Sequence, residues 1–213
     1  MTDIYFYTIP SAARIENFPI LQRIFSPQEL KKTNLMPETK HLTSLFGKLI
    51  AKTVASKKTG IALKQLQIER TAFGKPYFKN LPDFHFNVSH CENTVAVAFA
   101  DSPIGIDIEK LKTADFKISE RFFNQRENEY IKNSSNPDYA FFEVWTAKEA
   151  YFKHKGTGIN SDFSKFIVKD DMISKKITTT EYNGFILSVC LNKKSEINIK
   201  NFELLNVDNI ESL

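Results

Sequence analysis

Apolar residues recur in the first half of the chain with two different spacings, one helical and one extended. Over residues 37–57 they recur at intervals of three and four, which predicts an amphipathic helix. Residues 4–9 form a run of aromatic and β-branched side chains that stops at Pro10, which predicts an opening strand. Residues 84–88 alternate, and 94–100 follow after a short polar turn. This second pattern predicts a β-hairpin.

The next expected strand, residues 104–109, has two chemically different faces. Ser102-Pro103 ends the preceding run, and isoleucines then occupy the even positions 104, 106 and 108. Because successive side chains of a strand point to opposite faces, the isoleucines are expected to face a core. Gly105, Asp107 and Glu109 are then expected to share the other face.

The second half of the chain opens with helical patterns. Residues 118–131 and 139–155 are expected to be helices, and the second ends at Gly156-Thr157-Gly158. Two shorter runs, 163–168 and 184–191, have the composition of strands.

A helix followed by strands therefore occurs in both halves, and the change-over lies near residue 102. The 213 residues are enough for one large domain or for two small domains of about 100 residues each. Since no Gly/Ser-rich or Pro-rich linker separates the halves, two lobes would have to be closely joined. We expect an α+β protein with an N-terminal lobe over 1–102 and a C-terminal lobe over 103–213.

Composition narrows the class of protein. Hydrophobic residues make up 42% of the chain and include 19 Phe, enough to fill a core. No apolar run approaches the roughly 18 residues that span a bilayer, and the first residues lack the basic start of a secretory signal. We therefore expect a cytoplasmic protein without a membrane segment. Cys91 and Cys190 have no disulfide or zinc spacing, so free thiols with some burial are expected.

The net charge of +4 is mild. A nucleic-acid-binding protein would usually concentrate more Lys and Arg on one face. A modest positive charge suits an acidic protein partner or a phosphate-bearing ligand instead.

Asp107 and Glu109 place two carboxylates on one strand face, about 6–7 Å apart at their Cα atoms. Two negative charges at this distance favour a bound cation, and oxygen ligands without nearby Cys or His favour Mg²⁺ over zinc. The alternative is a solvated strand edge, where this pattern arises by chance.

The expected helix around residues 141–153 carries a second group of polar residues. Trp145, Glu149 and Lys153 follow at four-residue steps and therefore share one face. Glu149 could complete a three-carboxylate metal site or act as a base, and Lys153 could meet a phosphate oxygen. A surface ion pair of small energetic value is an equal alternative.

Two shorter patterns suit the binding of an anion. Ser89-His90 follows an expected strand, but adjacent residues of an extended chain point to opposite sides, which disfavours a nucleophilic Ser/His dyad. Gly74-Lys75-Pro76 holds a lysine between a flexible and a rigid residue, which suits a phosphate contact or an ordinary turn. Gly156-Thr157-Gly158 lacks the pattern of a P-loop.

Taken together, the patterns between Gly74 and about Gly158 resemble the 4'-phosphopantetheinyl transferase family, specifically its larger, monomeric surfactin-synthetase type. Three motifs of this family occur in the expected order. They are Gly74-Lys75-Pro76 leading to Phe86-Asn87-Val88-Ser89-His90, then Gly105-Ile106-Asp107-Ile108-Glu109, then Trp145-Thr146-Ala147-Lys148-Glu149-Ala150-Tyr151-Phe152-Lys153.

The resemblance implies a pseudo-dimer of two similar α/β lobes, with coenzyme A and magnesium in the cleft between them and a monomer sufficient for activity. Asp107, Glu109 and Glu149 match the metal ligands of the family. Ile108 between the two acids agrees with the surfactin type, in which the residue matching Glu149 is the proposed base.

The resemblance also implies how coenzyme A would be held. Lys75, Ser89 and His90 match positions that hold the adenosine and 3'-phosphate end, and Lys153 matches a lysine near the pyrophosphate. Lys148 belongs to the third motif, but the resemblance gives it no definite role.

The first third of the chain departs from the family pattern. Members often carry arginines before and within the first helix, where this chain has Lys31-Lys32, Lys40 and Ser44. Lysine supplies charge but not the bidentate geometry of arginine, so contacts from this region to the 3'-phosphate are in doubt. The segment Arg121-Phe122-Phe123-Asn124 is a candidate surface for the carrier protein, with core packing as the alternative.

By this resemblance the chain would transfer the 4'-phosphopantetheine group of coenzyme A to a serine of an acyl, peptidyl or polyketide carrier protein, with Mg²⁺, and release 3',5'-ADP. Two alternatives remain at this point. One is a non-catalytic module that binds coenzyme A, and the other is a metal-dependent phosphatase or nuclease that uses the same acids to activate water.

Overall fold

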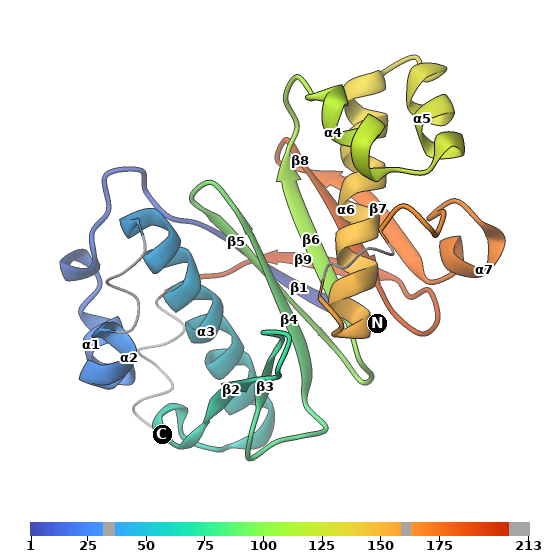
Figure 1. The fold of residues 1–213 in the computed structure, drawn as a ribbon. Helices are drawn as coiled ribbons and strands as arrows, with labels where there is room; N and C mark the ends of the chain where they lie inside the picture. Colours follow the sequence, from blue (N-terminus) through green and yellow to red (C-terminus); the bar gives the residue numbers. More distant parts are fainter. Residues whose placement is uncertain (32–36, 159–162, 205–213) are drawn as a thin grey trace.

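The computed structural model describes residues 1–31, 37–158 and 163–204. These residues form an α+β protein (Figure 1). The helices are α1 (Pro19–Ile24), α2 (Pro27–Lys31), α3 (Glu38–Thr59), α4 (Phe116–Phe122), α5 (Gln125–Lys132), α6 (Pro137–Lys155) and α7 (Asp171–Ser174), with short 3-10 turns η1 (Ile15–Asn17) and η2 (Leu63–Gln65). The strands are β1 (Thr2–Thr8), β2 (Ile68–Arg70), β3 (Pro76–Phe78), β4 (His85–Cys91), β5 (Thr94–Ala100), β6 (Gly105–Lys110), β7 (Ile177–Tyr182), β8 (Phe185–Cys190) and β9 (Ile197–Asn201).

The first sheet has the strand order β4-β5-β1-β9. β1 pairs antiparallel with β5, and β4 and β5 form the hairpin that the sequence predicted. On its other side β1 pairs in parallel with β9, with Thr2 opposite Ile197. The last strand of the described chain therefore completes a sheet that otherwise consists of N-terminal strands.

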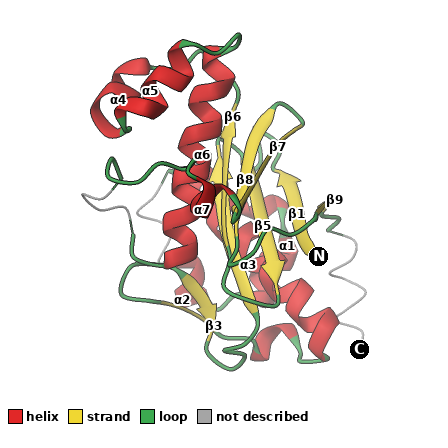
Figure 2. Ribbon diagram, turned by 90° about the vertical axis from the view of Figure 1, so that its right-hand side faces the viewer, coloured by secondary structure: helices red, strands yellow, loops and turns green. Residues whose placement is uncertain are grey.

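The second sheet has the order β6-β8-β7 and is antiparallel throughout. α6 packs across all three of its strands. A separate hairpin of β2 and β3 lies at the lower end of α3 in Figure 1. Figure 2 shows α4 and α5 at one end of α6, beyond the strands. Among the helices of the described ranges, none combines the length and the apolar character that crossing a membrane requires.

Three apolar clusters hold these layers together. One lies between α3 and the first sheet, and another lies between α6 and the second sheet. The third joins the two sheets and contains Ile104, Ile106 and Ile108, which are all fully buried. The prediction that these three isoleucines face a core is therefore confirmed.

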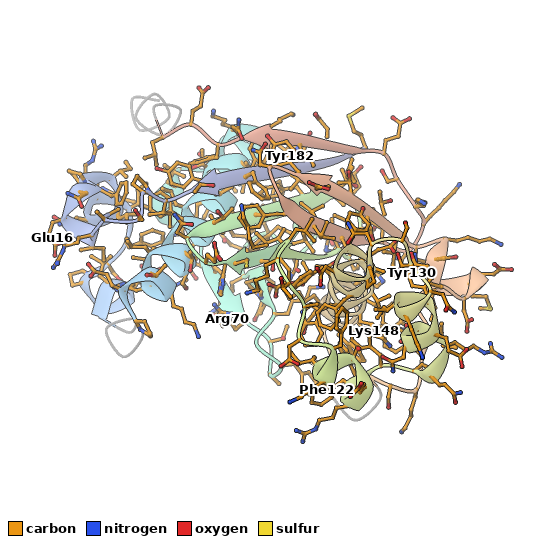
Figure 3. All side chains as sticks on the ribbon, turned by 90° about the horizontal axis from the view of Figure 1, so that it is seen from above. Glu16, Arg70, Phe122, Tyr130, Lys148 and Tyr182 are labelled. Carbon is orange, nitrogen blue, oxygen red and sulfur yellow. The ribbon has the colours of Figure 1, made fainter. Side chains whose placement is uncertain are left out.

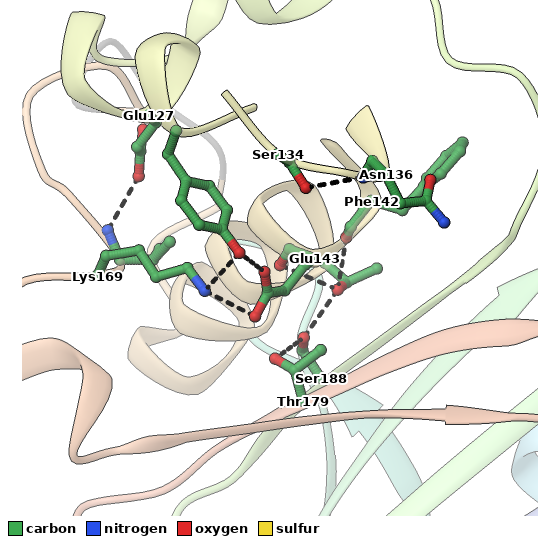
Figure 4. Close-up of polar contacts among 11 residues, drawn as sticks. Glu127, Ser134, Asn136, Phe142, Glu143, Lys169, Thr179 and Ser188 are labelled. Carbon is green, nitrogen blue, oxygen red and sulfur yellow. Dashed lines mark hydrogen bonds and ion pairs between the residues drawn. The ribbon is translucent and has the colours of Figure 1, made fainter. Parts of the chain in front are cut away.

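A chain of buried hydroxyl groups ties α6 to the second sheet (Figure 4). The Thr146 hydroxyl donates to the Phe142 carbonyl at 2.8 Å and lies 2.7 Å from the Ser188 hydroxyl. Ser188 in turn lies 2.7 Å from the Thr179 hydroxyl on β7. Because each hydroxyl can both donate and accept, the chain satisfies buried polar groups across three elements.

The predicted helix over 118–131 is wrong in one respect, because the structure has two helices there. Asn124 separates α4 from α5 and caps α5. Its side chain accepts the Arg126 N–H at 3.0 Å, and the Glu127 carboxylate accepts the Asn124 N–H at 3.1 Å. This reciprocal capping box starts a new helix in the middle of a continuous helical pattern.

The predicted strand over 163–168 is also wrong. These residues form turns, and their aromatic side chains pack around the ammonium group of Lys148. Four real strands escaped prediction. β2 and β3 have three residues each, too few for a pattern, and β7 and β9 are dominated by threonine, asparagine and charged residues whose side chains are mostly half-exposed.

Lys148 and Glu127 form an ion pair that is completely buried, with both side chains 0% exposed and a distance of 2.8 Å. The Lys148 ammonium also donates to the carbonyls of Phe163 at 2.7 Å and Phe166 at 2.8 Å. Glu127 accepts the Val168 N–H at 2.9 Å. Figure 3 shows Lys148 among the side chains of the second half. The pair therefore holds the 163–168 segment and α5 against α6.

We expect Lys148→Met to lower the free energy of unfolding by about 3–5 kcal/mol, because Glu127 would remain as a buried charge without a counter-charge. Urea denaturation followed by circular dichroism measures this loss. Adding Glu127→Leu to Lys148→Met should recover much of it, since no buried charge then remains.

The matched control is Lys169→Met. Lys169 pairs with Glu143 at 2.6 Å, but its side chain is 40% exposed (Figure 4). An exposed pair contributes about 0–1 kcal/mol, so this variant should stay close to wild type. Equal losses for the two lysine variants would contradict the structural role assigned to Lys148.

Candidate active site

A cavity of about 500 Å³ opens between the two halves of the chain. Its walls come from α3, the β2–β3 hairpin, β4, β6, α6 and the turn that follows α6. All seven site residues predicted from the sequence line it. They are Lys75, Ser89, His90, Asp107, Glu109, Glu149 and Lys153.

Gly105 places β6 directly against α6. A Cβ atom at this position would lie 2.0 Å from the Ala150 carbonyl oxygen and 2.3 Å from the His154 nitrogen. Any side chain here would push the strand away from the helix. Since residues two apart share a face, Asp107 and Glu109 follow Gly105 along the side of β6 that faces α6.

Asp107 is buried at 4% exposure, and its two oxygens have different surroundings. Oδ1 accepts from the Ser89 hydroxyl at 2.7 Å and from the Lys153 ammonium at 2.6 Å. Oδ2 is buried without a hydrogen-bond partner. A buried carboxylate oxygen without a partner is costly unless a cation or a donor meets it.

The three acids share one electrostatic environment. Burial raises the pKa of Glu149 to about 7, and the negative charge of Asp107 adds to this rise, while Lys153 opposes it. Burial and then Asp107 also raise the pKa of Glu109. A carboxyl group with a pKa near 7 is suited to accept a proton at neutral pH.

The acids do not form a ready-made metal cluster. Within residues 1–31, 37–158 and 163–204, no three His, Cys, Asp or Glu side chains converge closely enough to hold an ion. The Lys153 ammonium instead neutralises Asp107, and it also donates to the Ser89 hydroxyl at 3.0 Å. An ammonium has three donors, so Lys153 keeps one for a further acceptor.

Ser89 and His90 point to opposite sides of β4, as strand alternation predicted. Ser89 is buried and bonds to β6, whereas His90 is exposed. Partial desolvation, together with the nearby Lys153, lowers the pKa of His90. A Ser/His dyad is therefore absent from this pair, and His90 is the one of the two that an anion in the cavity can reach.

Lys75 has partners that its sequence pattern did not indicate. Its ammonium donates to the Ile104 carbonyl at 3.0 Å and to the His154 carbonyl at 3.1 Å. Burial lowers its pKa to about 8. Lys75 thus ties the β2–β3 hairpin to the start of β6 and to the end of α6. Main-chain carbonyls leave no pattern in a sequence, so this contact could not be read from it.

The N-terminal wall of the cavity differs from the sequence expectation. Ser44 lines the cavity, together with Lys48 and Arg70, which the sequence analysis missed. The Arg70 guanidinium donates to the Gly74 carbonyl at 2.7 Å, which fixes the hairpin (Figure 3). Lys32 and the side chain of Lys31 lie outside the described residues. β2 has only three residues, too few for an alternation that would have marked Arg70 in the sequence.

The aromatic pair Phe122-Phe123 is divided between surface and core. Phe122 is 41% exposed, with the Arg121 guanidinium 5.0 Å from its ring, and Figure 3 places it at the edge of the molecule. Phe123 is 5% exposed and stacks on Phe141 with ring centres 5.5 Å apart. Core packing therefore holds for Phe123, and of the two rings only that of Phe122 lies at the surface.

Cys91 and Cys190 are both buried free thiols. The Cys91 thiol donates to Glu109 Oε2 at 3.3 Å. This contact to one of the acids was not anticipated, because the two residues are 18 positions apart and no motif links them.

Two family models match the chain. The model described as the 4'-phosphopantetheinyl transferase superfamily matches residues 103–202, and the model described as 4'-phosphopantetheinyl transferase, N-terminal, matches residues 16–102. Together they cover both walls of the cavity.

Curated relatives agree with these models. The 4'-phosphopantetheinyl transferase Sfp of Bacillus subtilis (strain 168) is 32% identical over 148 residues, which are 68% of this chain and 66% of the relative. The 4'-phosphopantetheinyl transferase psf-1 of Bacillus pumilus is 35% identical over 130 residues, 59% of this chain and 55% of the relative. The L-aminoadipate-semialdehyde dehydrogenase-phosphopantetheinyl transferase of Xenopus laevis is 27% identical over 161 residues, which are 67% of this chain and 53% of the relative. The matches thus span from about half to two thirds of these relatives.

Proposed function

Because the chain belongs to the 4'-phosphopantetheinyl transferase superfamily and is of the Sfp type, we propose that it moves the 4'-phosphopantetheine group of coenzyme A to a serine of an apo carrier protein. The observation that carries this proposal is the cavity that brings Asp107, Glu109, Glu149 and Lys153 together. Three acids, of which Glu109 and Glu149 have raised pKa values, with an ammonium beside them, suit the transfer of a charged phosphoryl group.

We propose further that the chain is a pseudo-dimer of two similar lobes, 1–102 and 103–213, with the active site in the cleft between them; β9 is the exception to this division, because it returns to pair with β1 in the first sheet. Support comes from the lining of the cavity, to which α3 and β4 contribute from one side and β6 and α6 from the other. A site assembled within a single chain makes a monomer sufficient.

The chemistry of the donors suits a bound Mg²⁺ ion, and the acid side chains would have to turn toward one another to hold it, since no three of them converge within the described ranges. The donors are carboxylate oxygens, which Mg²⁺ prefers, and the buried Oδ2 of Asp107 has no other partner in the described structure. Asp107, Glu109 and Glu149 would hold the ion. A bound divalent cation would neutralise charge on the pyrophosphate of coenzyme A.

The chain's own residues would then do the following. Glu149 would accept the proton of the carrier serine, whose oxygen forms a bond to the β-phosphorus of coenzyme A. The bond from that phosphorus to the oxygen of 3',5'-ADP breaks, and 3',5'-ADP leaves with the electron pair. Lys153 would direct its remaining N–H to a pyrophosphate oxygen.

Of Lys75, Ser89 and His90, only His90 is exposed, which suits it to receive the 3'-phosphate end of coenzyme A. Lys75 lines the same cavity and keeps one N–H beyond its two carbonyl bonds. Ser89 lines the cavity as well, but its hydroxyl is already engaged with β6. An acidic carrier protein would suit the net charge of +4, and Phe122 is a candidate contact for it.

Intact mass measurement tests the proposed function. The chain is incubated with Mg²⁺, coenzyme A and a panel of apo carrier proteins from fatty-acid, polyketide and nonribosomal-peptide synthesis. We expect a carrier to gain one phosphopantetheine group, together with release of 3',5'-ADP.

Two other results would point to other functions. Hydrolysis of coenzyme A without any carrier would indicate a metal-dependent phosphatase. Binding of coenzyme A without any reaction across the whole panel would indicate a non-catalytic module. Either result would overturn the proposal of a transferase.

A further inference from the structure

Two aromatic side chains of α6, Trp145 and Phe152, line the cavity. Both rest on the ring of Phe163. The ring centres of Trp145 and Phe163 are 5.6 Å apart, and Phe152 stacks on Phe163 at 5.5 Å with an angle of 10° between the ring planes. We call these three residues the aromatic wall. Phe163 is 4% exposed and forms its inner layer, which supports the two rings that line the cavity.

The inner layer belongs to a segment that is neither helix nor strand. Residues 163–168 form turns, so their main-chain groups need partners outside a regular ladder. Lys148 and Glu127 supply such partners. The bonds run from the Lys148 ammonium to the carbonyls of Phe163 and Phe166, and from the Val168 N–H to Glu127 (Figure 4). The two side chains of the buried ion pair therefore also hold the segment that carries Phe163.

The Lys148 ammonium is fully used by these contacts. It has three N–H groups, which serve Glu127 at 2.8 Å and the two carbonyls at 2.7 and 2.8 Å. Its nitrogen also lies 5.2 Å from the ring centre of Phe163 and 4.3 Å from that of Phe166, close enough for cation–π attraction. Lys148 thus holds Phe163 by its main chain and by its ring.

The aromatic wall lies on one side of the acids along α6. Gly156, Lys153, Glu149 and Trp145 line the cavity in that order, at steps of three or four residues, which are about 4.5–6 Å of helix each. Coenzyme A has its parts in a matching order, namely the adenosine end, the pyrophosphate and the pantetheine arm. With Lys153 at the pyrophosphate, the arm would run toward Trp145. Its methyl and methylene groups suit contact with aromatic rings.

We propose that Lys148 and Glu127 are positioning residues, which hold the aromatic wall in the place that the pantetheine arm of coenzyme A requires. The inference rests on the proposed function for the identity of the ligand. It gives the ion pair a role in binding beyond its role in stability. A loosened wall would have to be ordered by the ligand, and ordering two aromatic side chains weakens binding by about tenfold.

The first test uses the double variant Lys148→Met/Glu127→Leu, in which much of the stability is expected to return. Calorimetry with Mg²⁺ measures binding of coenzyme A and of adenosine 3'-phosphate 5'-diphosphate, which keeps all three phosphates and lacks only the arm. We expect coenzyme A to bind about tenfold more weakly than to wild type, and the nucleotide to bind equally well. Lys169→Met, which removes the exposed pair with Glu143, is the control and should bind both ligands as wild type does.

Fluorescence reports on the wall directly, because Trp145 is the single tryptophan of the chain. Quenching by acrylamide measures how accessible its ring is. We expect more quenching in the unliganded double variant than in unliganded wild type, although both are folded. Coenzyme A should reduce this quenching, and the nucleotide without the arm should not.

Phe163→Leu tests the wall while the ion pair stays intact. Leucine keeps the carbonyl that Lys148 needs but removes the ring on which Trp145 and Phe152 rest. The expected result is the same selective loss, with weaker binding of coenzyme A and unchanged binding of the nucleotide. This variant decides the question even where the double variant fails to fold.

Four results would overturn the inference. They are wild-type affinity for coenzyme A in the folded double variant, wild-type affinity in Phe163→Leu, an equal loss of affinity for coenzyme A and for the nucleotide, and equal affinities for the two ligands in the wild type. Failure of the proposed function has a different signature. The expected binding pattern in a chain that modifies no carrier protein would overturn the transferase and leave the role of the pair in place.

Discussion

Asp107→Asn is expected to abolish phosphopantetheine transfer while the chain still folds. The amide keeps an oxygen that can accept from Ser89 and Lys153, so the local hydrogen bonds survive. The negative charge and the second anionic oxygen are lost. A cation and its ligands contribute several kcal/mol to charge stabilisation, so kcat should fall at least about a thousandfold.

Intact mass of the carrier protein measures the rate, and thermal unfolding followed by circular dichroism verifies the fold. Asp101→Asn is the matched control, because Asp101 is exposed in the turn before β6. It should transfer at the wild-type rate. Near wild-type transfer by Asp107→Asn, or by the more disruptive Asp107→Ala, would remove Asp107 from the proposed cation site.

Glu149→Gln is expected to bind coenzyme A and to be nearly inactive, because glutamine cannot accept the serine proton. We expect intact mass of the carrier protein to show no transfer, and calorimetry to show that coenzyme A still binds. Glu143→Gln is the control on the same helix, because Glu143 bonds to Lys169 and Tyr130 and does not line the cavity (Figure 4). Normal turnover in Glu149→Gln would rule out Glu149 as the base.

Glu149→Gln should lower activity but raise the stability of the folded chain when no cation is present. The folded chain raises the pKa of Glu149 from 4.5 to about 7. Between these values the folded state holds the proton more tightly than the unfolded state, so wild-type stability falls as the pH rises through this window. Above about pH 7 the loss is complete. Glutamine has no such ionisation, and in chelator at pH 8 Glu149→Gln should therefore melt above the wild type.

At pH 4 this difference should narrow, because Glu149 is then largely neutral in both states. A gain in melting temperature that is the same at pH 4 and pH 8 would mean that ionisation of Glu149 is not its cause. A variant that is more stable and less active is the expected signature of an acid held in an unfavourable place for a functional reason.

Strand and helix periodicity was sufficient to predict the acidic part of the site. Alternation on β6 predicted that Gly105, Asp107 and Glu109 share a face, and four-residue spacing placed Glu149 beside Lys153. These are local relationships, because they depend only on the geometry of one element. The structure then brings the two elements together, which Gly105 makes possible.

Relationships between distant elements could not be predicted in the same way. Lys75 and Lys148 both donate to main-chain carbonyls, and every residue has a carbonyl, so no sequence pattern marks the partner. The capping box at Asn124 interrupts a helical pattern that is otherwise continuous. The bonds from Ser89 and Cys91 to β6 required knowledge that two edge strands are neighbours.

The parallel pairing of β9 with β1 has a consequence for the order in which the chain can fold during its synthesis. β1 is made first, but the strand that covers its second edge spans Ile197–Asn201. Until the ribosome has released the chain as far as Asn201, β1 keeps one edge open to other strands. The first sheet therefore cannot be completed before the second half is made. Until then, only the arrival of β9 from the same chain can prevent β1 from pairing with strands of other molecules.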